Sequence, residues 1–380
     1  MFQKFSWKHL LPVGLLAAVF MASYWFFSGE PIPVSIGIFA AVLVSSLPIP
    51  WLLSCPVALW RARKKALAAG IELPDKDLLA ALARMDTLLL GRCGIITSGE
   101  PYIASTTPIG TNRAALLTMA ASAEREAKHP IGKAIVKFAE EHNLRIVDPV
   151  TTNEMPGKGI EAIVNRSPIR VGRPDWLQEE GISIEAEYLT RADQISVKGR
   201  QPIFVTDSRY LRGILVLDDD IQPGIVPALR DIRQMGIRTV LLTSDNARIA
   251  RATEKQIEVD EAHGNVTAVG WQKEVRARQS RGNCVAVLGA PSFGEDSLVA
   301  PDADLGVTPL ADVATLVTIA RHAMRIVHQN QTISVITAIM LLLPSMGLLH
   351  AFGGPFMPPF LPAIVLVLVS ILILVNSLRA

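Results

Sequence analysis

The sequence predicts a membrane protein with about four transmembrane helices and a cytoplasmic α/β region. Half of the 380 residues are hydrophobic, and the mean hydropathy of +0.34 is high for a soluble chain. The apolar residues gather in long uncharged stretches near both ends. In the central region, short apolar runs such as Leu88 to Leu90 are typical of buried parallel strands, and they alternate with helical patterns.

Each of the four uncharged stretches is long enough to cross a bilayer, which takes roughly 20 residues. The second stretch contains Pro48, Pro50 and Pro56, which should break it. Four prolines between Pro355 and Pro362 predict a loop at the start of the fourth. The stretches run from Leu10 to Ser28, Pro31 to Trp60, Thr332 to Leu349, and Ala351 to Leu378.

The distribution of basic residues predicts how the chain crosses the membrane. The two loops opposite the central region, near Glu30 and from His350 to Pro362, carry no Lys or Arg. Because cytoplasmic loops are enriched in these residues, we expect both termini and the central region in the cytoplasm, in a multi-pass protein of the cell's inner or plasma membrane. A signal peptide over Met1 to Ser28 is the alternative, but the apolar run is long for one and no cleavage site is evident.

Charge and cysteine content exclude two classes of protein. A net charge of +2 argues against a nucleic-acid binder, so we expect no nucleic-acid partner. The three cysteines, Cys55, Cys93 and Cys284, are too few and too scattered for a disulfide framework.

The stretch from Thr87 to Pro101 carries the first functional motif. Its apolar strand ends in a Gly-containing turn, and in α/β sheets the chemistry sits at the carboxyl ends of strands. A plain strand and turn is the structural alternative. The run GRCGIITSGEP, from Gly91 to Pro101, resembles the phosphorylation loop of the P-type ATPases, most closely the heavy-metal pumps. That loop reads Asp-Lys-Thr-Gly-Thr-Leu-Thr-x-Gly-x-Pro, so Gly91 stands where the family has its phosphorylated Asp.

The residues after Pro101 resemble the α+β nucleotide-binding domain that these pumps insert into their haloacid dehalogenase-like phosphorylation domain. Two candidate helices, Ala114 to Ala127 and Ile131 to Glu141, precede short strands. The family recognises adenine with a His-Pro, a Glu five residues before it, and a G-x-G about thirty residues on. Alone, His-Pro is a turn and G-x-G is weak, but the joint spacing implies ATP as a ligand. The matching residues are Glu124, His129, Gly157, Gly159 and Gly172.

Remnants of the phosphoryl site follow a hinge expected at Gly213 to Pro223. Thr243-Ser244-Asp245-Asn246 resembles Thr-Gly-Asp-Asn, which implies that Thr243 binds a phosphoryl group, with Asp245 beside it. Lys273 fits the Lys that neutralises that group. After the strand Val285 to Leu288, Ala290 replaces a magnesium-binding Asp, which leaves Asp296, or Glu295, as a weak substitute. We therefore expect Mg²⁺ binding to be weak or absent.

The membrane positions that hold metal in the pumps have lost their ligands. Cys55-Pro56-Val57 resembles Cys-Pro-Cys, and with Val57 in place of the second thiol, Cys55 is a weak metal ligand. A proline-kinked helix with one buried Cys is the favoured alternative. Asn376 and Ser370 are interpreted as helix-packing residues. Further ligand positions of the family align with Thr337, Ala338, Leu366 and Val369.

These features predict five segments. They are two transmembrane helices at 1–60, a stalk and the first part of the phosphorylation-like domain at 61–101, a nucleotide-binding-like domain at 102–212, the second part of the phosphorylation-like domain at 213–325, and two transmembrane helices at 326–380.

The resemblance spans nearly all of the chain but only the second half of a pump, and it suggests a degenerate, truncated one. The first hypothesis is a pseudo-ATPase, not an enzyme, that binds ATP and acts on a protein partner, either a pump or a metal-protein assembly factor. The second keeps ATP hydrolysis by a P-type metal-transporting ATPase, with the missing half supplied by another chain. The third is a scaffold or a decaying pseudogene product.

Overall fold

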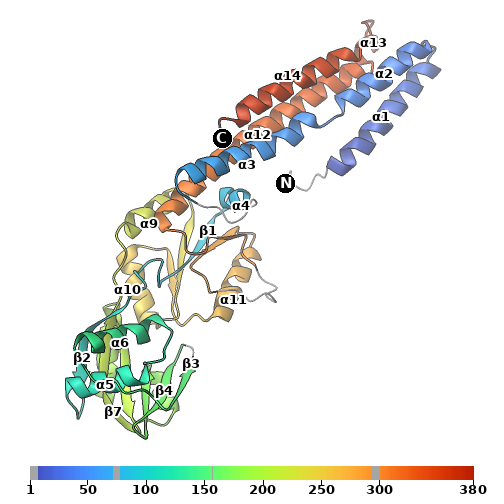
Figure 1. The fold of residues 1–380 in the computed structure, drawn as a ribbon. Coiled ribbons are helices and arrows are strands. Elements are labelled where there is room, and N and C mark those ends of the chain that lie inside the picture. Colours follow the sequence, from blue (N-terminus) through green and yellow to red (C-terminus); the bar gives the residue numbers. More distant parts are fainter. Residues whose placement is uncertain (1–6, 72–77, 156, 292–299) are drawn as a thin grey trace. The chain divides into compact units, whose positions relative to one another are not determined.

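The computed structural model describes residues 7–71, 78–155, 157–291 and 300–380 (Figure 1). They divide into two compact units, one made of Met1–Ala83 with Thr315–Ala380 and the other of Arg84–Ala314. The long helix α12 begins in the second unit and continues through the first.

The first unit is helical and apolar. Within the described residues, three helical segments are long and apolar enough to cross a membrane: Ile32–Ala68, Leu310–Ser345 and Phe360–Ser377. A shorter apolar helical stretch covers Pro12–Phe27. The predicted multi-pass organisation is confirmed. The helices are α1 (Trp7–Phe27), α2 (Ile32–Ser45), α3 (Ile49–Ala68), α4 (Leu78–Arg84), α12 (Leu310–Ser345), α13 (Leu348–Ala351) and α14 (Phe360–Ser377).

Proline positions explain where these helices start and stop. Pro48 is the N-cap of α3, after a break that begins at the C-cap of α2, Ser46. Pro50 lies in the first turn of α3, where its missing N–H costs little. Pro56 stays inside α3, so the expectation that it breaks the helix is wrong. In a membrane helix the freed backbone groups can be satisfied by neighbouring atoms.

Amide side chains join α12 to α14 inside the first unit. The Asn330 side chain is fully buried, and its Nδ2 donates to Ser377 Oγ at 2.8 Å. Asn376 Nδ2 donates to Asn330 Oδ1, also at 2.8 Å. Asn376 therefore packs helix against helix, as expected, whereas the Ser370 hydroxyl bonds the Leu366 carbonyl of its own helix.

One of the two sheets of the second unit has five strands, all paired in parallel, in the order β11-β10-β1-β8-β9. Its middle strand β1 is buried at every position. Leu89 of β1 packs with Trp271 and Val275 of one covering helix, α11. The strands expected at Arg238 to Leu242 and Val285 to Leu288 are present. The elements are β1 (Thr87–Gly91), β8 (Arg238–Leu242), β9 (Glu261–His263), β10 (Val285–Leu288), β11 (Ala303–Asp304), α9 (Ile225–Gln234), α10 (Ala247–Ile257) and α11 (Ala268–Gln279).

A six-stranded antiparallel sheet is inserted after β1, in the order β2-β7-β6-β5-β4-β3. Helices α5 and α6 share one hydrophobic core with this sheet, and α7 and α8 share another. The elements are β2 (Tyr102–Pro108), α5 (Arg113–Ala123), α6 (Pro130–Glu141), β3 (Thr151–Met155), β4 (Gly159–Val164), β5 (Ser167–Gly172), α7 (Pro174–Glu179), α8 (Ala186–Val197), β6 (Gln201–Asp207) and β7 (Tyr210–Asp218).

The hinge expected from Gly213 onward lies later in the chain. Residues 213–218 belong to β7, an interior strand that pairs with β2 on one side and β6 on the other. Residues 213–217 of β7 are all buried. A continuous apolar run of this kind is typical of a strand that is covered on both faces. The two connections between the sheets are instead residues 97–99 and 219–222, which run antiparallel and share a bridge between Thr97 and Ile221.

The consecutive acids Asp218, Asp219 and Asp220 at this crossing each accept a hydrogen bond from another side chain. Asp219 accepts hydrogen bonds from Ser98 Oγ at 2.7 Å and from the Gly99 amide at 3.2 Å. Asp218 pairs with Arg200 at 2.6 Å. Asp219 therefore ties one connection to the other, whereas Asp218 holds Arg200, just before β6.

Candidate nucleotide site

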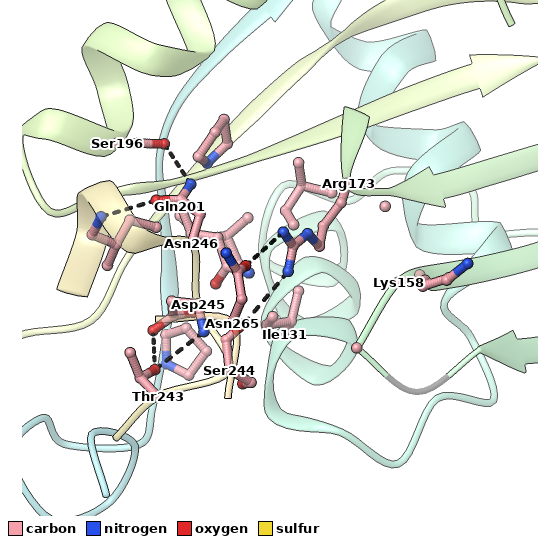
Figure 2. Close-up of a pocket in the computed structure, with 18 of the residues that line it drawn as sticks. Ile131, Lys158, Arg173, Ser196, Gln201, Thr243, Ser244, Asp245, Asn246 and Asn265 are labelled. Atoms are coloured by element: carbon pink, nitrogen blue, oxygen red, sulfur yellow. Dashed lines mark hydrogen bonds between the residues drawn. The ribbon is translucent and has the colours of Figure 1, made fainter. Parts of the chain in front are cut away.

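A cavity of about 840 Å³ lies within the second unit and is lined by residues of both domains (Figure 2). The structure brings all of the predicted nucleotide residues to its wall. It also places Thr243 and Asp245 there, at the carboxyl end of β8. Glu124, His129, Gly157, Gly159 and Gly172 come from the inserted domain.

His129 is held in one orientation by the start of α6. It is the N-cap residue, and its Nδ1 accepts the Gly132 amide hydrogen at 3.0 Å. Its Nε2 lies 3.2 Å from Oε2 of Glu124, a side chain only 3% exposed. Because Nδ1 is an acceptor, the hydrogen-bond network assigns the proton to Nε2, which faces the carboxylate. The imidazole ring is thereby fixed at the cavity wall.

Glu124 and His129 each change the pKa of the other. Burial raises the pKa of Glu124, and the hydrogen bond and charge of His129 partly offset that rise. The hydrogen bond to Glu124 raises the pKa of His129 above its usual 6.5, although burial opposes this.

The glycines serve two different purposes. Gly157 has φ of +77°, and a Cβ there would meet no atom within 4 Å, so its backbone lies open to a ligand. Gly159 and Gly172 pair across β4 and β5. A Cβ on either would lie 2.7 Å from the Trp176 ring. Close packing against Trp176, rather than ligand approach, therefore requires these two glycines.

The phosphorylation-like end has no space for a nucleophile. Gly91 ends β1, and a Cβ there would lie 2.5 Å from the Gly289 carbonyl oxygen. Any larger side chain has to displace that backbone. Ala290 follows directly and packs against the core of the parallel sheet. The loop after β10 thus fills the space that a carboxylate at position 91 would need.

A magnesium ion does not fit the described residues at this end. Gly91 and Ala290 supply no carboxylate, and the Asp245 carboxylate is already occupied. In the part of the chain that the structure describes, no group of three or more His, Cys, Asp or Glu side chains is placed to hold a metal. The predicted weak ligand Asp296 lies outside the described residues, as does Glu295.

Arg92 forms an ion pair with Asp245, a contact that the sequence did not lead us to expect. Its Nη1 lies 2.8 Å from Asp245 Oδ2, and the two side chains are only 11% and 13% exposed. Thr243 Oγ1 donates to the same oxygen at 2.8 Å. The signal was present, since Arg92 follows Gly91 where the pump loop has Lys. The Lys273 side chain, in contrast, is exposed on α11, and the described residues that line the cavity do not include it.

Arg173 reaches from the inserted domain to the turn after β8 (Figure 2). Its Nη2 donates to Asn265 Oδ1 at 2.9 Å, and its Nη1 donates to the Ser244 carbonyl at 3.4 Å. Asn246 Nδ2 donates to Ser196 Oγ at 2.9 Å in the opposite direction. No sequence pattern predicted these contacts, because they join residues far apart in the chain.

Cys55, the predicted weak metal ligand of the membrane region, is half-buried on α3 in the first unit.

A parallel sheet with a Thr-x-Asp turn after one strand and an inserted antiparallel domain after another defines a haloacid dehalogenase-like protein. A family model described as haloacid dehalogenase-like hydrolase matches residues 85–289, and the chain belongs to that family. The curated relatives are more specific. A probable copper-exporting P-type ATPase of Archaeoglobus fulgidus is 26% identical over 97% of this chain and 48% of its own length. A silver exporting P-type ATPase of Salmonella typhimurium is also 26% identical, over 97% and 47%.

Solved structures have the same fold. A zinc-transporting PIB-type ATPase in the E2.Pi state gives a TM-score of 0.65 at 20% identity, covering 98% of this chain and 62% of that one. The catalytic domain of the CPx-ATPase CopB-B, solved in a study of nucleotide binding, gives 0.53 at 18% identity, covering 68% and 98%. The chain is thus similar to heavy-metal P-type ATPases, and it spans about half the length of the curated relatives it matches.

Proposed function

We propose that this protein is a catalytically inactive, P-type ATPase-like membrane protein that binds an adenine nucleotide and acts through a protein partner. The observation that carries the proposal is the contrast between the cavity and the adjoining end of β1, where Arg92 lines the cavity and Gly91 does not. All five residues expected to hold the nucleotide lie on the cavity wall, whereas the Gly289 carbonyl fills the space of the nucleophile.

Phosphoryl transfer to the protein requires a nucleophile in line with the γ-phosphate and cations that neutralise its charge. Position 91 has no side chain. Cys93 borders the cavity, but burial and the charges of Asp219 and Asp245 raise the pKa of its thiol, which disfavours the reactive thiolate. These features support a protein that binds without transferring phosphate.

Binding of the base is supported by a rigid ring and an open backbone. His129 is held through both ring nitrogens, so it loses little side-chain freedom when it stacks on a purine. The open backbone at Gly157 allows close approach. The ligand class comes from the resemblance to the pumps.

The partner belongs to metal transport or to the assembly of a metal enzyme. Similarity to copper-exporting, silver exporting and zinc-transporting ATPases supports this setting. The half-pump alternative requires a carboxylate nucleophile, and the geometry at Gly91 argues against one.

The test uses the full chain in lipid nanodiscs. Isothermal titration with ATP, ADP and AMP should give saturable binding that is lost in His129→Ala and kept in the control His142→Ala. His142 is the exposed C-cap residue at the other end of α6. Incubation with γ-labelled ATP should give no acid-stable phosphoprotein.

Two results would contradict the proposal. A labelled phosphoprotein would restore the half-pump hypothesis. Absence of binding by all three nucleotides would leave a scaffold.

A further inference from the structure

Four exposed cations lie within five consecutive residues near the end of α3: Arg61, Arg63, Lys64 and Lys65. The buried face of this helix end consists of alanines at positions 58, 62 and 66, so the cations lie on its outer face. Within the part of the chain that the structure describes, none of the four forms an ion pair. Their charges are therefore available to an anionic ligand.

A contact with the end of α14 places these cations at the membrane surface (Figure 1). Arg61 Nε donates to the Leu378 carbonyl at 3.2 Å, so Arg61 is level with the point where the apolar helix α14 ends. Lys65 follows four residues later, which is about 6 Å along a helix. Since the headgroup layer beside the hydrocarbon core is roughly 5–7 Å thick, the four charges lie at the height of the lipid headgroups.

Trp60, the residue before Arg61, supports this height. Its side chain is 57% exposed, and its ring centroid lies 5.6 Å from Lys64 Nζ. Trp is enriched where the hydrocarbon core meets the headgroups, because its ring is largely apolar and its N–H is polar. The cations that follow Trp60 therefore begin at this interface.

Two further cations lie at the same end of the helical unit. Arg379 follows α14, and its carbonyl oxygen lies 3.1 Å from His322 Nε2 on α12. Arg325, three residues after His322, is exposed. Among the described residues of the first unit, Glu30 is the one side-chain carboxylate, and it lies in the turn between α1 and α2. Cations from three helices thus meet here without a described carboxylate to neutralise them.

We propose that this basic cluster binds the headgroups of anionic phospholipids in the leaflet predicted to face the cytoplasm. Basic segments directly beside a membrane helix are attracted to anionic lipid surfaces. Arg61 orients the site, because its bond to Leu378 fixes the guanidinium while its two Nη groups, without a partner among the described residues, can donate to a phosphate. The surface is separate from the nucleotide cavity and does not depend on the function proposed above. The basic cluster consists of Arg61, Arg63, Lys64, Lys65, Arg325 and Arg379.

The test is native mass spectrometry of the full chain in detergent, titrated separately with phosphatidylglycerol and phosphatidylcholine. One Lys or Arg near an anionic lipid surface is worth roughly fivefold in affinity. Phosphatidylglycerol should therefore bind at least about tenfold more tightly than phosphatidylcholine. Added salt should reduce this difference, because it screens exposed charges.

Variants locate the effect. Arg61→Gln should weaken phosphatidylglycerol binding roughly fivefold, and Lys64→Gln with Lys65→Gln at least about tenfold. The control, Lys133→Gln with Lys137→Gln, removes two exposed cations from α6 in the second unit and should change neither affinity. Phosphatidylcholine binding and thermal unfolding without added lipid should stay the same in every variant, which separates loss of the site from loss of the fold.

Two outcomes would overturn the proposal. Equal affinities for the two lipids would leave the basic cluster to an acidic protein partner. An equal loss of phosphatidylglycerol binding in the Lys133 and Lys137 control would show that total charge, and not this cluster, attracts the lipid.

Discussion

At the end of β1, the Gly289 carbonyl oxygen lies where the side chain of residue 91 would begin. The space that a carboxylate at position 91 would need is taken by the Gly289 carbonyl. Replacing Gly91 by Asp alone therefore does not restore the site. Arg92 shows the same accommodation, since its guanidinium now pairs with Asp245. The close packing at Gly91 and the Arg92–Asp245 ion pair fill this end of the sheet, so the site differs from an active one by more than a single missing group.

We expect Gly91→Asp to destabilise the protein without restoring phosphorylation. Even Gly91→Ala should cost roughly 1–3 kcal/mol of unfolding free energy, because its Cβ overlaps the Gly289 backbone. Thermal unfolding and a phosphoprotein assay measure the two effects. Gly37→Ala is the control, because a Cβ at that helical position meets no atom within 4 Å. A phosphorylated, fully stable Gly91→Asp protein would contradict this view.

The Glu124 and His129 pair predicts a pH-dependent stability. Both groups have a raised pKa in the folded protein, so the folded state holds protons more tightly than the unfolded chain. The contribution of Glu124 is complete below its usual pKa of 4.5 and is lost as the pH rises above that value, and the contribution of His129 is complete below its usual pKa of 6.5 and is lost as the pH rises above 6.5.

Glu124→Gln should therefore flatten the fall of melting temperature above that pH and lower the pKa of His129 measured by NMR on labelled histidines. Glu154 also raises the pKa of His129 and remains in this variant, so the decrease is partial. An unchanged histidine titration would show that the pair does not interact.

At the scale of secondary-structure elements, the contact between α12 and α14 depends on amides in an apolar setting. Asn330→Leu leaves the Asn376 amide and the Ser377 hydroxyl without their hydrogen-bond partner on α12. We expect a loss of about 0.6–2 kcal/mol, measured by thermal unfolding in detergent. Ser370→Ala, which removes a bond within α14 only, should have a smaller effect. Equal effects of the two variants would argue against a role for the amides in joining the helices.

Strands could be predicted from the sequence where they are buried on both faces, because burial requires a continuous run of apolar residues. The runs at Arg238 to Leu242 and Val285 to Leu288 are strands because parallel strands covered on both faces need continuous apolar residues. The same criterion, applied to residues 213–218, predicts the strand β7. We instead expected a hinge there, because the segment resembles the hinge of the pumps. Pairing across a sheet is a tertiary property that a local pattern does not contain.

At the scale of the whole molecule, spacing predicted which residues of the inserted domain meet. Glu124, His129 and Gly157 line one cavity as expected. The contact of Arg173 with Asn265 was not predictable, because a long charged side chain meets its partner only in the assembled fold. The pairing of Arg92 with Asp245 had a signal in the sequence, since Arg92 follows Gly91 where the pump loop has Lys. The role of Lys273 stays a prediction, and its side chain is exposed on α11.

The connections between the two domains should loosen when Asp219 is replaced. Asp219→Ala removes the acceptor for Ser98 Oγ and the Gly99 amide. We expect hydrogen exchange at residues 97–99 and 219–222 to accelerate roughly five- to tenfold. Asp231→Ala, on α9, is the control and should leave those amides unchanged. Unaltered exchange in Asp219→Ala would mean that backbone bonds alone hold the crossing.

The antiparallel run of residues 97–99 beside 219–222 gives the inserted domain the properties of a cassette. Its entry and exit lie next to each other, so a short turn can rejoin them after excision, and closing so short a loop costs little entropy. Removing residues 102–218 should leave the order of the parallel sheet unchanged, because all of its strands lie outside that interval. The same junction offers a place where a fluorescent protein can be exchanged for the domain without stretching the chain.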